Sequence, residues 1–183
     1  MSKLEKHISI TPEEYLESEK YSTVKHEYVA GHVYAMVGAS ESHNLIAGSL
    51  YSALRAHLRG SACRVFMSDM KVRIADTFYY PDVMVTCDKT DTEPYYKSRP
   101  VLIAEVLSTT TESRDTLEKR VAYQSLRSLQ EYVVVSQDKP EVRIYRRTDM
   151  DWELEICTEE DLVKLTSIGL EVPVENLFED VWR

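Results

Sequence analysis

The sequence predicts an α/β fold, a mixed β-sheet flanked by helices. Strand-like segments and segments with apolar residues at helical spacing follow one another in the order helix, hairpin, helix, strands, helix, strands. The chain has 183 residues, of which 43% are hydrophobic and 29% charged, and it contains no repeat, low-complexity tract or linker. We therefore expect residues 1–183 to form a single domain around one core.

The N-terminal part is predicted to contain a short helix followed by a hairpin. Thr11, Pro12 and Glu14 have the spacing of a capping box with proline at the first helical position, so a helix is expected from here to about Glu19. Two strand-like segments, KHEYV and HVYAMV, follow and are joined across Ala30-Gly31. This arrangement is typical of a β-hairpin.

The central part is predicted to contain one long helix and three strands. Apolar residues recur at helical spacing over 40–59, and Gly60 is suited to end this helix. Residues 64–75 alternate between apolar and polar side chains, as in a half-exposed strand. Residues 79–85 and 102–108 are strand-like apolar runs.

The next part is predicted to contain a helix and a buried strand. Residues 109–113 are rich in N-cap candidates, so the helix is expected to begin here and to continue to about residue 129. Leu117, Val121 and Leu126 are expected to face inward from it. Residues 131–136 then form an apolar run typical of a buried strand.

The C-terminal part is predicted to be a hairpin over 141–147 and 152–158, then a small strand and a helical turn. The net charge of −9 belongs to this part, since residues 149–183 hold 11 acidic residues and only two basic ones. Residues 1–148 carry equal numbers of acidic and basic side chains. The acidic total therefore weakens the case for a nucleic-acid partner without excluding one.

The sequence indicates a cytoplasmic protein without a membrane span. No apolar run approaches the roughly 20 residues needed to cross a bilayer, and the N-terminal residues lack the apolar core of a signal peptide. Cys63, Cys87 and Cys157 are odd in number and share no metal-ligand spacing. We expect them to be reduced thiols.

Two carboxylates interrupt apolar segments that otherwise have the pattern of buried strands. Asp82 lies in YYPDVMV and Glu105 in LIAEVLS. A charge in such a segment is costly unless a partner such as a cation offsets it. If the two strands are neighbours in register, both carboxylates point to one side and predict a site for Mg²⁺ or Mn²⁺. For each carboxylate alone, a solvated strand end or a structural ion pair is the alternative.

A third chemical group is predicted on the helix that follows. Asp115, Lys119 and Tyr123 are spaced by four residues, so they lie along one stripe. If this helix folds back over the strand of Glu105, Lys119 can reach a phosphate or orient the attacking water, with Asp115 holding its ammonium group. The alternative for Asp115 and Lys119 is an ordinary surface ion pair of small worth.

Together these motifs resemble those of the PD-(D/E)XK nuclease superfamily. The matching residues are Pro81-Asp82, the strand with Glu-Val-Leu at 105–107 and the downstream D-x-x-x-K helix. Within the superfamily, the chain is most similar to the Uma-type restriction endonuclease family. The similarity continues through TPEEYLE, EYVAGHVYAM, GASESHNLI, FMSDMKV, DTLEKRVAYQ and EYVVV, and this ordered series is more specific than the PD motif alone.

The resemblance implies a restriction-endonuclease-like core and divalent-metal-dependent cleavage of DNA, with Mg²⁺ or Mn²⁺ as cofactor. It makes Asp82 and Glu105 metal ligands and catalytic residues. Glu27, in the first hairpin, is a further metal ligand or else an exposed hairpin charge. The superfamily's lysine is expected at position 107, where this chain has Leu107, so the resemblance assigns its catalytic role to Lys119.

Other residues are weaker candidates for this site. Arg120 is adjacent to Lys119 but points about 100° away around the helix. His43, near a helix start, is expected to make ordinary polar contacts, although it could lie near the site. The tyrosines that flank the acidic residues are candidate substrate contacts: Tyr79, Tyr95 and Tyr96.

The favoured function is therefore a metal-dependent endonuclease with DNA as its partner. The alternative is a catalytically inactive protein of the same fold that binds a partner through its acidic C-terminal segment, an idea motivated by the missing lysine at 107. A third hypothesis is an enzyme acting on a small phosphoester. A homodimer is expected only by analogy with double-strand cutters, in which two sites face two strands.

Overall fold

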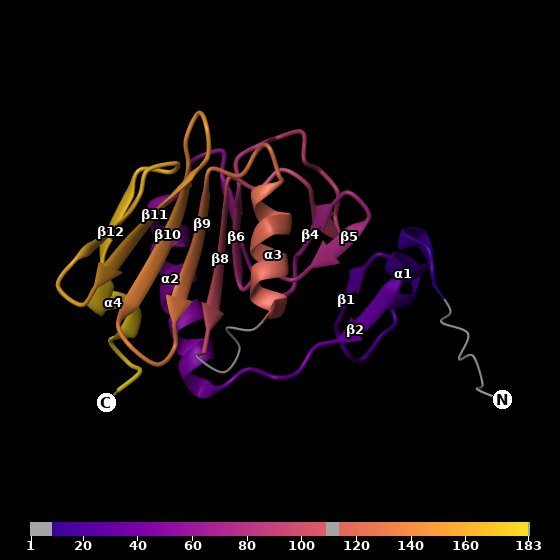
Figure 1. Ribbon diagram of the computed structural model, residues 1–183, viewed down its shortest axis with the longest axis horizontal. Coiled ribbons are helices and arrows are strands. Elements are labelled where there is room, and N and C mark those ends of the chain that lie inside the picture. The colour runs from indigo at the N-terminus through magenta and orange to yellow at the C-terminus, as the bar shows by residue number, and fades with distance from the viewer. Residues whose placement is uncertain (1–8, 109–113, 183) are drawn as a thin grey trace.

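The computed structural model describes residues 9–108 and 114–182, and a six-stranded sheet forms the centre of this part of the chain (Figure 1). The strands follow the order β11-β10-β9-β8-β6-β3. Their bounds are β3 (Arg64–Met67), β6 (Val83–Thr86), β8 (Leu102–Leu107), β9 (Glu131–Ser136), β10 (Glu141–Arg147) and β11 (Trp152–Thr158). Neighbouring strands are antiparallel except for β8 and β9, which are parallel. The sheet is therefore mixed, as predicted.

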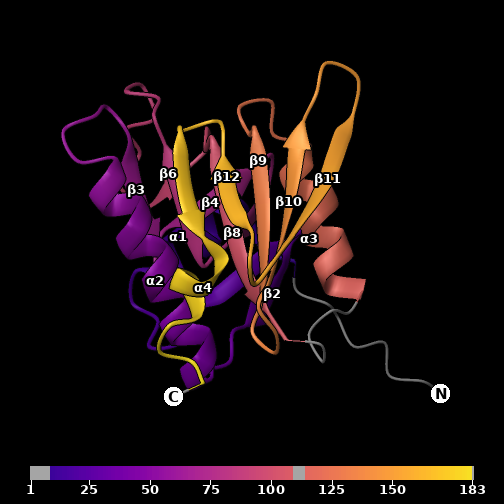
Figure 2. The same cartoon turned by 90° about the vertical axis from the view of Figure 1, so that its left-hand side faces the viewer.

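Two helices, α2 (Glu41–His57) and α3 (Arg114–Gln124), cover opposite faces of this sheet (Figure 2). Because strand side chains alternate between faces, the sheet divides its apolar residues between two cores. The core beneath α2 includes Val83, Val85, Ala104, Val106, Val133 and Val135. The core beneath α3 includes Met84, Ile103, Tyr132 and Val134, together with Tyr123 of the helix itself. Glu105 lies on the α3 face, since it is two residues from Ile103.

A second sheet of five strands has the order β2-β1-β5-β4-β7. Its strands are β1 (His26–Val29), β2 (His32–Ala35), β4 (Lys71–Ile74), β5 (Thr77–Tyr79) and β7 (Tyr96–Lys97). The predicted hairpin is confirmed, because β1 pairs with β2 across Ala30 and Gly31. Both turn residues have positive φ, at 49° and 89°, as a tight hairpin turn requires.

The helix α1 (Pro12–Glu19) covers one face of the second sheet. It begins with the predicted capping box, in which Thr11 and Glu14 exchange side-chain and backbone hydrogen bonds. Tyr15 of this helix is fully buried against Tyr28 and Phe78. The opposite face of the sheet joins the core beneath α3, so α3 lies between the two sheets.

Two segments that are predicted as single strands are each divided between the two sheets, so these two predictions are wrong. Residues 64–75 form β3 in the large sheet and β4 in the small one, with a break at Ser68, whose φ is +55°. Residues 79–85 likewise belong to β5 and β6, with Pro81-Asp82 between them. The two breaks lie side by side, since the Ser68 amide donates to the Asp82 carbonyl at 3.0 Å. The fold accordingly has two principal sheets where one was expected.

The inward face of α3 also differs from the prediction. Leu117 and Val121 are 51% and 60% exposed, whereas Tyr123 is fully buried. Leu126, beyond the helix end, is partly buried against the core beneath α3, as predicted. The stripe through Lys119 and Tyr123 faces inward because both side chains bond to groups beneath the helix. The predicted N-cap segment, 109–113, lies outside the described residues.

The C-terminal acidic segment closes the core beneath α2. It forms a two-stranded sheet of β12 (Leu162–Leu165) and β13 (Leu170–Pro173), followed by α4 (Val174–Phe178). The prediction of a single strand is therefore wrong, while the terminal helical turn is confirmed. Val163, Leu165 and Leu177 of this segment are buried in the core beneath α2.

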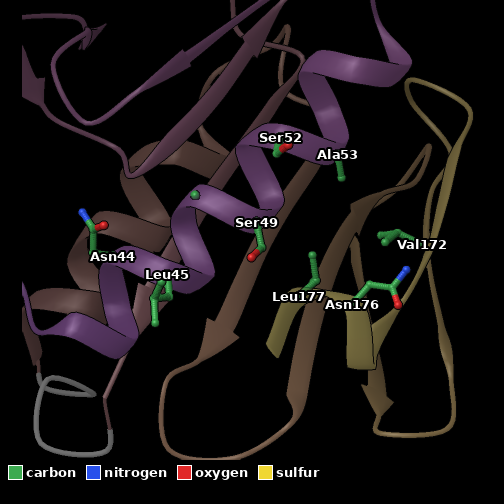
Figure 3. A pocket seen from close by; sticks show the side chains of 9 residues that line it. Asn44, Leu45, Ser49, Ser52, Ala53, Val172, Asn176 and Leu177 are labelled. Carbon is green, nitrogen blue, oxygen red and sulfur yellow. The ribbon is translucent and has the colours of Figure 1, made fainter. Parts of the chain in front are cut away.

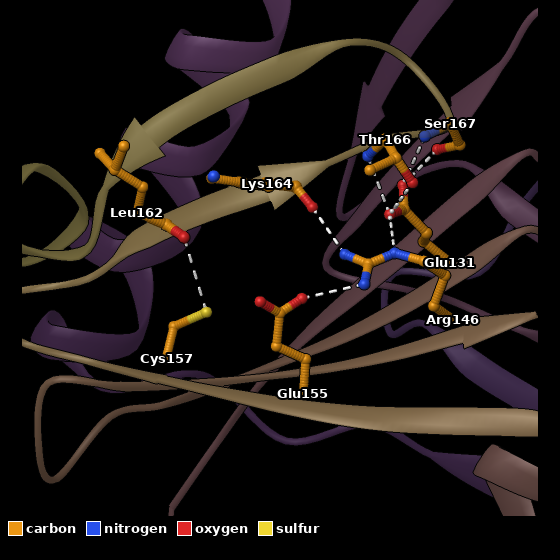
Figure 4. A network of polar contacts seen from close by, with 8 residues as sticks. All are labelled: Glu131, Arg146, Glu155, Cys157, Leu162, Lys164, Thr166 and Ser167. Carbon is orange, nitrogen blue, oxygen red and sulfur yellow. Dashed lines mark hydrogen bonds and ion pairs between the residues drawn. The ribbon is translucent and has the colours of Figure 1, made fainter.

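A buried network fastens this terminal hairpin to the large sheet (Figure 4). Glu131, at the start of β9, is fully buried and accepts hydrogen bonds from the backbone and hydroxyl groups of Thr166 and Ser167. Arg146 donates to Glu131 at 3.1 Å, to Glu155 at 2.9 Å and to the carbonyl of Lys164 at 2.8 Å. Every acceptor on Glu131 is thus satisfied by the hairpin or by β10.

The prediction of three reduced thiols is wrong for two of them. Cys63 and Cys87 form a disulfide, with Cα atoms 3.9 Å apart. In the antiparallel pair of β3 and β6, Arg64 faces Thr86. Cys63 and Cys87 are the next positions beyond this pair, so the two strands bring them together. Cys157 is free and buried. Within the described residues, no helix combines the length and the apolar character that crossing a membrane requires.

Candidate functional site

Asp82 and Glu105 come together where the two sheets meet. The antiparallel register of β6 and β8 places Val83 opposite Ala104, so Asp82 and Glu105 are the next facing positions. The Asp82 amide donates to Oε2 of Glu105 at 3.3 Å, and the Val106 amide donates to Oδ2 of Asp82 at 2.8 Å. The predicted convergence of the two carboxylates is therefore present, although Asp82 lies between strands and not within one.

His43, on α2, contacts Asp82 of this pair. It lies in the first turn of α2, where its amide is capped by the hydroxyl of Ser40 at 3.2 Å. Its Nε2 is 3.1 Å from Oδ2 of Asp82. This hydrogen bond raises the pKa of His43, while burial acts in the opposite direction. The protonated ring is thus favoured beside the aspartate.

Glu105 is buried, with 7% of its surface exposed, and it faces Tyr123 on α3. The Tyr123 hydroxyl donates to Oε1 of Glu105 at 2.7 Å. Burial, followed by the negative charge of Asp82, raises the pKa of Glu105 well above its usual value, whereas Lys119 and the Tyr123 hydroxyl lower it. Burial and Asp82 therefore disfavour the charged form of Glu105 more than Lys119 and Tyr123 favour it.

Lys119 and Glu27 form an ion pair that closes this side of the site. Nζ of Lys119 is 2.7 Å from Oε1 of Glu27, which projects from β1. The same ammonium group lies 5.4 Å from the ring centroid of Tyr79. Glu27 is only 9% exposed, so the expectation of an exposed hairpin charge is wrong. The side chain of Asp115, the predicted partner of Lys119, lies outside the described part of the chain.

The remaining candidates lie away from the carboxylates. Arg120 donates to the hydroxyl of Tyr145 on β10 at 2.8 Å, whereas Lys119 bonds to Glu27 on β1, so the two side chains point to different places, as the helical positions predicted. Tyr96 packs edge-on against Phe78 under α1. Tyr95 is 54% exposed beside Lys20, and only Tyr79 of the three predicted tyrosines borders the site.

The donor set fits a hard divalent cation held by few protein ligands. Among the described residues no group of three or more His, Cys, Asp or Glu side chains is arranged to enclose a metal ion. Mg²⁺ does not need such an enclosure, because it commonly uses one or two carboxylates and keeps several waters. Asp82 and Glu105 provide two oxygen donors, and a bound cation would favour the charged form of Glu105 that burial and Asp82 disfavour.

A hollow in the surface lies elsewhere, between α2 and α4 (Figure 3). Its volume is about 500 Å³, and it is open to solvent. The lining includes Asn44, Leu45, Ser49, Ser52, Asn176 and Leu177. These side chains are neutral, so the hollow lacks the charged groups that a metal ion or a phosphate requires.

The fold is of the restriction-endonuclease-like class. The structure resembles the crystal structure described as "a putative nuclease belonging to DUF820" from Anabaena variabilis, with a TM-score of 0.74 over 94% of this chain and 99% of that one, at 18% identity. Residues 12–175 match the Uma2 family, described as "Putative restriction endonuclease". The chain belongs to this family.

Two relatives in Synechocystis share much of the sequence. The uncharacterized protein slr1290 is 38% identical over 173 residues, which cover 92% of this chain and 91% of that protein. The uncharacterized protein sll1609 is 34% identical over 151 residues, which cover 79% of this chain and 85% of that protein. The family match over residues 12–175 includes the segments that carry Asp82, Glu105 and Lys119 in this chain.

Sequence reasoning did not identify the partners of the two carboxylates. Tyr123 was assigned to the Lys119 stripe, but nothing in the pattern indicated that its hydroxyl binds Glu105. The sequence leaves open whether His43 makes ordinary polar contacts or lies near the site, and its bond to Asp82 depends on how α2 packs. The signal available for Tyr123 is its spacing of four from Lys119, which places both on one stripe of the helix.

Proposed function

We propose that this protein is a divalent-metal-dependent endonuclease that hydrolyses phosphodiester bonds of DNA. The observation that carries the proposal is the convergence of Asp82 and Glu105, with Lys119 near enough to act on the charge of Glu105. Membership of the Uma2 family supports it. DNA as the substrate and a homodimer as the assembly follow from the same family resemblance and stay predictions.

Asp82 and Glu105 would hold Mg²⁺ or Mn²⁺. When bound, such an ion supplies an acidified water and offsets negative charge on the phosphate. His43 and the Val106 amide hold the Asp82 carboxylate, and Tyr123 holds that of Glu105, so both donors are oriented before any ligand arrives. Carboxylates that are oriented before binding suit a metal site, because such a site requires its ligands in a precise geometry.

Lys119 would stabilise negative charge that develops on the phosphate. In the structure its ammonium group is held by Glu27, so a phosphate oxygen would compete with Glu27 for it. Glu27 thereby keeps Lys119 beside the carboxylate pair when no substrate is present. The role of Glu27 as a further metal ligand stays a prediction. In the structure its Oε1 accepts the hydrogen bond from Lys119.

Nicking of supercoiled plasmid in Mn²⁺, with and without EDTA, tests this function. We expect the wild type and a control, Glu153→Gln on exposed β11, to nick the plasmid, and Glu105→Gln to lose the activity. EDTA should abolish cleavage in every sample. Cleavage by Glu105→Gln at the wild-type rate would contradict the assignment.

The same samples distinguish the proposed nuclease from a catalytically inactive binding protein. In that case calorimetry would detect no Mn²⁺ binding to the wild type, and a stable protein complex would form without cleavage. Binding of Mn²⁺ that is lost in Glu105→Gln, without plasmid cleavage, would instead favour a small phosphoester as substrate.

A further inference from the structure

Four tyrosines form a row that crosses the molecule beneath α3. The rings of Tyr79, Tyr123, Tyr132 and Tyr145 follow one another with centroid distances of 5.6, 5.5 and 5.8 Å. They belong to β5, α3, β9 and β10, so the row connects both sheets to the helix. Arg120 of α3 bonds to the hydroxyl at the far end of the row. The helix is thus anchored at two points one turn apart.

The row contacts the two groups on which the proposed chemistry depends, Glu105 and Lys119. Tyr123 donates to Oε1 of Glu105, while the Asp82 amide donates to Oε2. Within the described residues, Tyr123 is the only side chain that hydrogen-bonds to Glu105. The ring of Tyr79 contacts both Tyr123 and the ammonium group of Lys119. One row of rings therefore touches the carboxylate and the lysine together.

We propose that Tyr123 is a positioning residue, whose hydroxyl fixes the orientation of the Glu105 carboxylate for ligand binding. This proposal rests on the proposed function, in which Glu105 holds the metal ion. Tyr123 is fully buried and packed between Tyr79 and Tyr132, so its ring has no room to turn and its hydroxyl defines one position for Oε1. The remaining lone pairs of Glu105 are left for a cation.

The row offers a matched control for this role. The hydroxyl of Tyr132, the next ring along, is buried and has no hydrogen-bond partner in the described part of the chain. Tyr123→Phe and Tyr132→Phe thus each remove one buried hydroxyl from adjacent rings, but only the first removes a bond to Glu105. A difference between the two variants reports the hydroxyl's action on Glu105 and not a general loss of packing.

Calorimetric titration with Mn²⁺ and plasmid-nicking kinetics test the proposal. In Tyr123→Phe we expect Mn²⁺ affinity to fall about tenfold, as for other groups that orient a metal ligand, and kcat to fall while KM for plasmid stays unchanged. Tyr132→Phe should match the wild type in each measurement. Equal values for the two variants would overturn the proposal.

Crystal structures of the two variants keep this test independent of the proposed function. We expect the Glu105 carboxylate to turn in Tyr123→Phe and to keep its orientation in Tyr132→Phe. An unchanged Glu105 in Tyr123→Phe would overturn the positioning role. A wild type that binds no Mn²⁺ would overturn the proposed function alone, because the orientation of Glu105 can still be compared.

Discussion

At the scale of single residues, the surroundings of Glu105 make its charged form unfavourable in the folded protein. Its carboxylate is buried and lies next to Asp82, and both circumstances disfavour the charged form. The ammonium group of Lys119 offsets only part of this charge, since it is bonded to Glu27. A side chain retained in such a position indicates a functional requirement more than a structural one.

We therefore expect Glu105→Gln to be more stable than the wild type in the absence of metal ions. The neutral amide removes the repulsion from Asp82 and keeps the shape of the side chain. The gain should be present at pH 7 and should disappear at acidic pH, where the wild-type carboxyl is protonated in both the folded and the unfolded state. Urea unfolding in EDTA measures it. A variant clearly less stable than the wild type would show that the Glu105 charge is structurally required.

The sequence predicted the two carboxylates but not what surrounds them. Asp82 and Glu105 could be recognised because a charge within an apolar segment is costly, which is a local property. The partner of Lys119 could not be recognised in this way, because Glu27 is 92 residues away and belongs to another sheet. Contacts of that kind depend on how the elements pack.

At the scale of elements, periodicity predicted where strands occur but not where they change sheets. The alternation over 64–75 continues through Ser68, although β3 and β4 pair with different partners. Alternation reports only which side chains share a face of a strand, and it does not report which sheet the strand joins. The break at Pro81-Asp82 is missed for the same reason. Helix starts were predicted better, because Thr11 acts through local capping bonds.

The orientation of α3 leads to a second prediction about stability. Leu117 lies on the exposed face of the helix, whereas Leu129, just beyond its end, is fully buried. Leu117→Ala should change the free energy of unfolding by no more than about 0.5 kcal/mol. Leu129→Ala should cost roughly 2–5 kcal/mol, because it opens a cavity. Urea unfolding of both variants compares them, and a large loss in Leu117→Ala would mean that α3 is rotated.

At the scale of the whole molecule, the acidic C-terminal segment is a structural part of the fold. The large negative charge of 149–183 is carried on exposed positions of β11 to α4, while the apolar residues of this segment fill the core beneath α2. Composition alone suggested an appended interface. The alternating pattern of burial in β12 and β13 explains how one segment can be both acidic and essential to the core.

The buried network around Glu131 makes the attachment of this segment testable. Glu131→Ala leaves Arg146 and the Thr166 and Ser167 donors without their acceptor, so we expect a loss of roughly 3–5 kcal/mol. Glu155→Ala, whose side chain is 43% exposed, should cost less than about 1 kcal/mol. Urea unfolding measures both. Similar losses in the two variants would contradict the dominant role of Glu131.

The chain crosses between the two sheets, and these crossings limit where residues can be inserted or deleted. Two passages, at Ser68 and at Pro81-Asp82, run side by side and are joined by a hydrogen bond. An added or deleted residue in either passage would shift Asp82 relative to Glu105 and would change both sheets at once. The turn between β10 and β11 lies at the opposite extreme, because Met150 is 94% exposed and the turn bonds only to itself. Length variation among related chains should therefore accumulate in that turn and avoid the crossing.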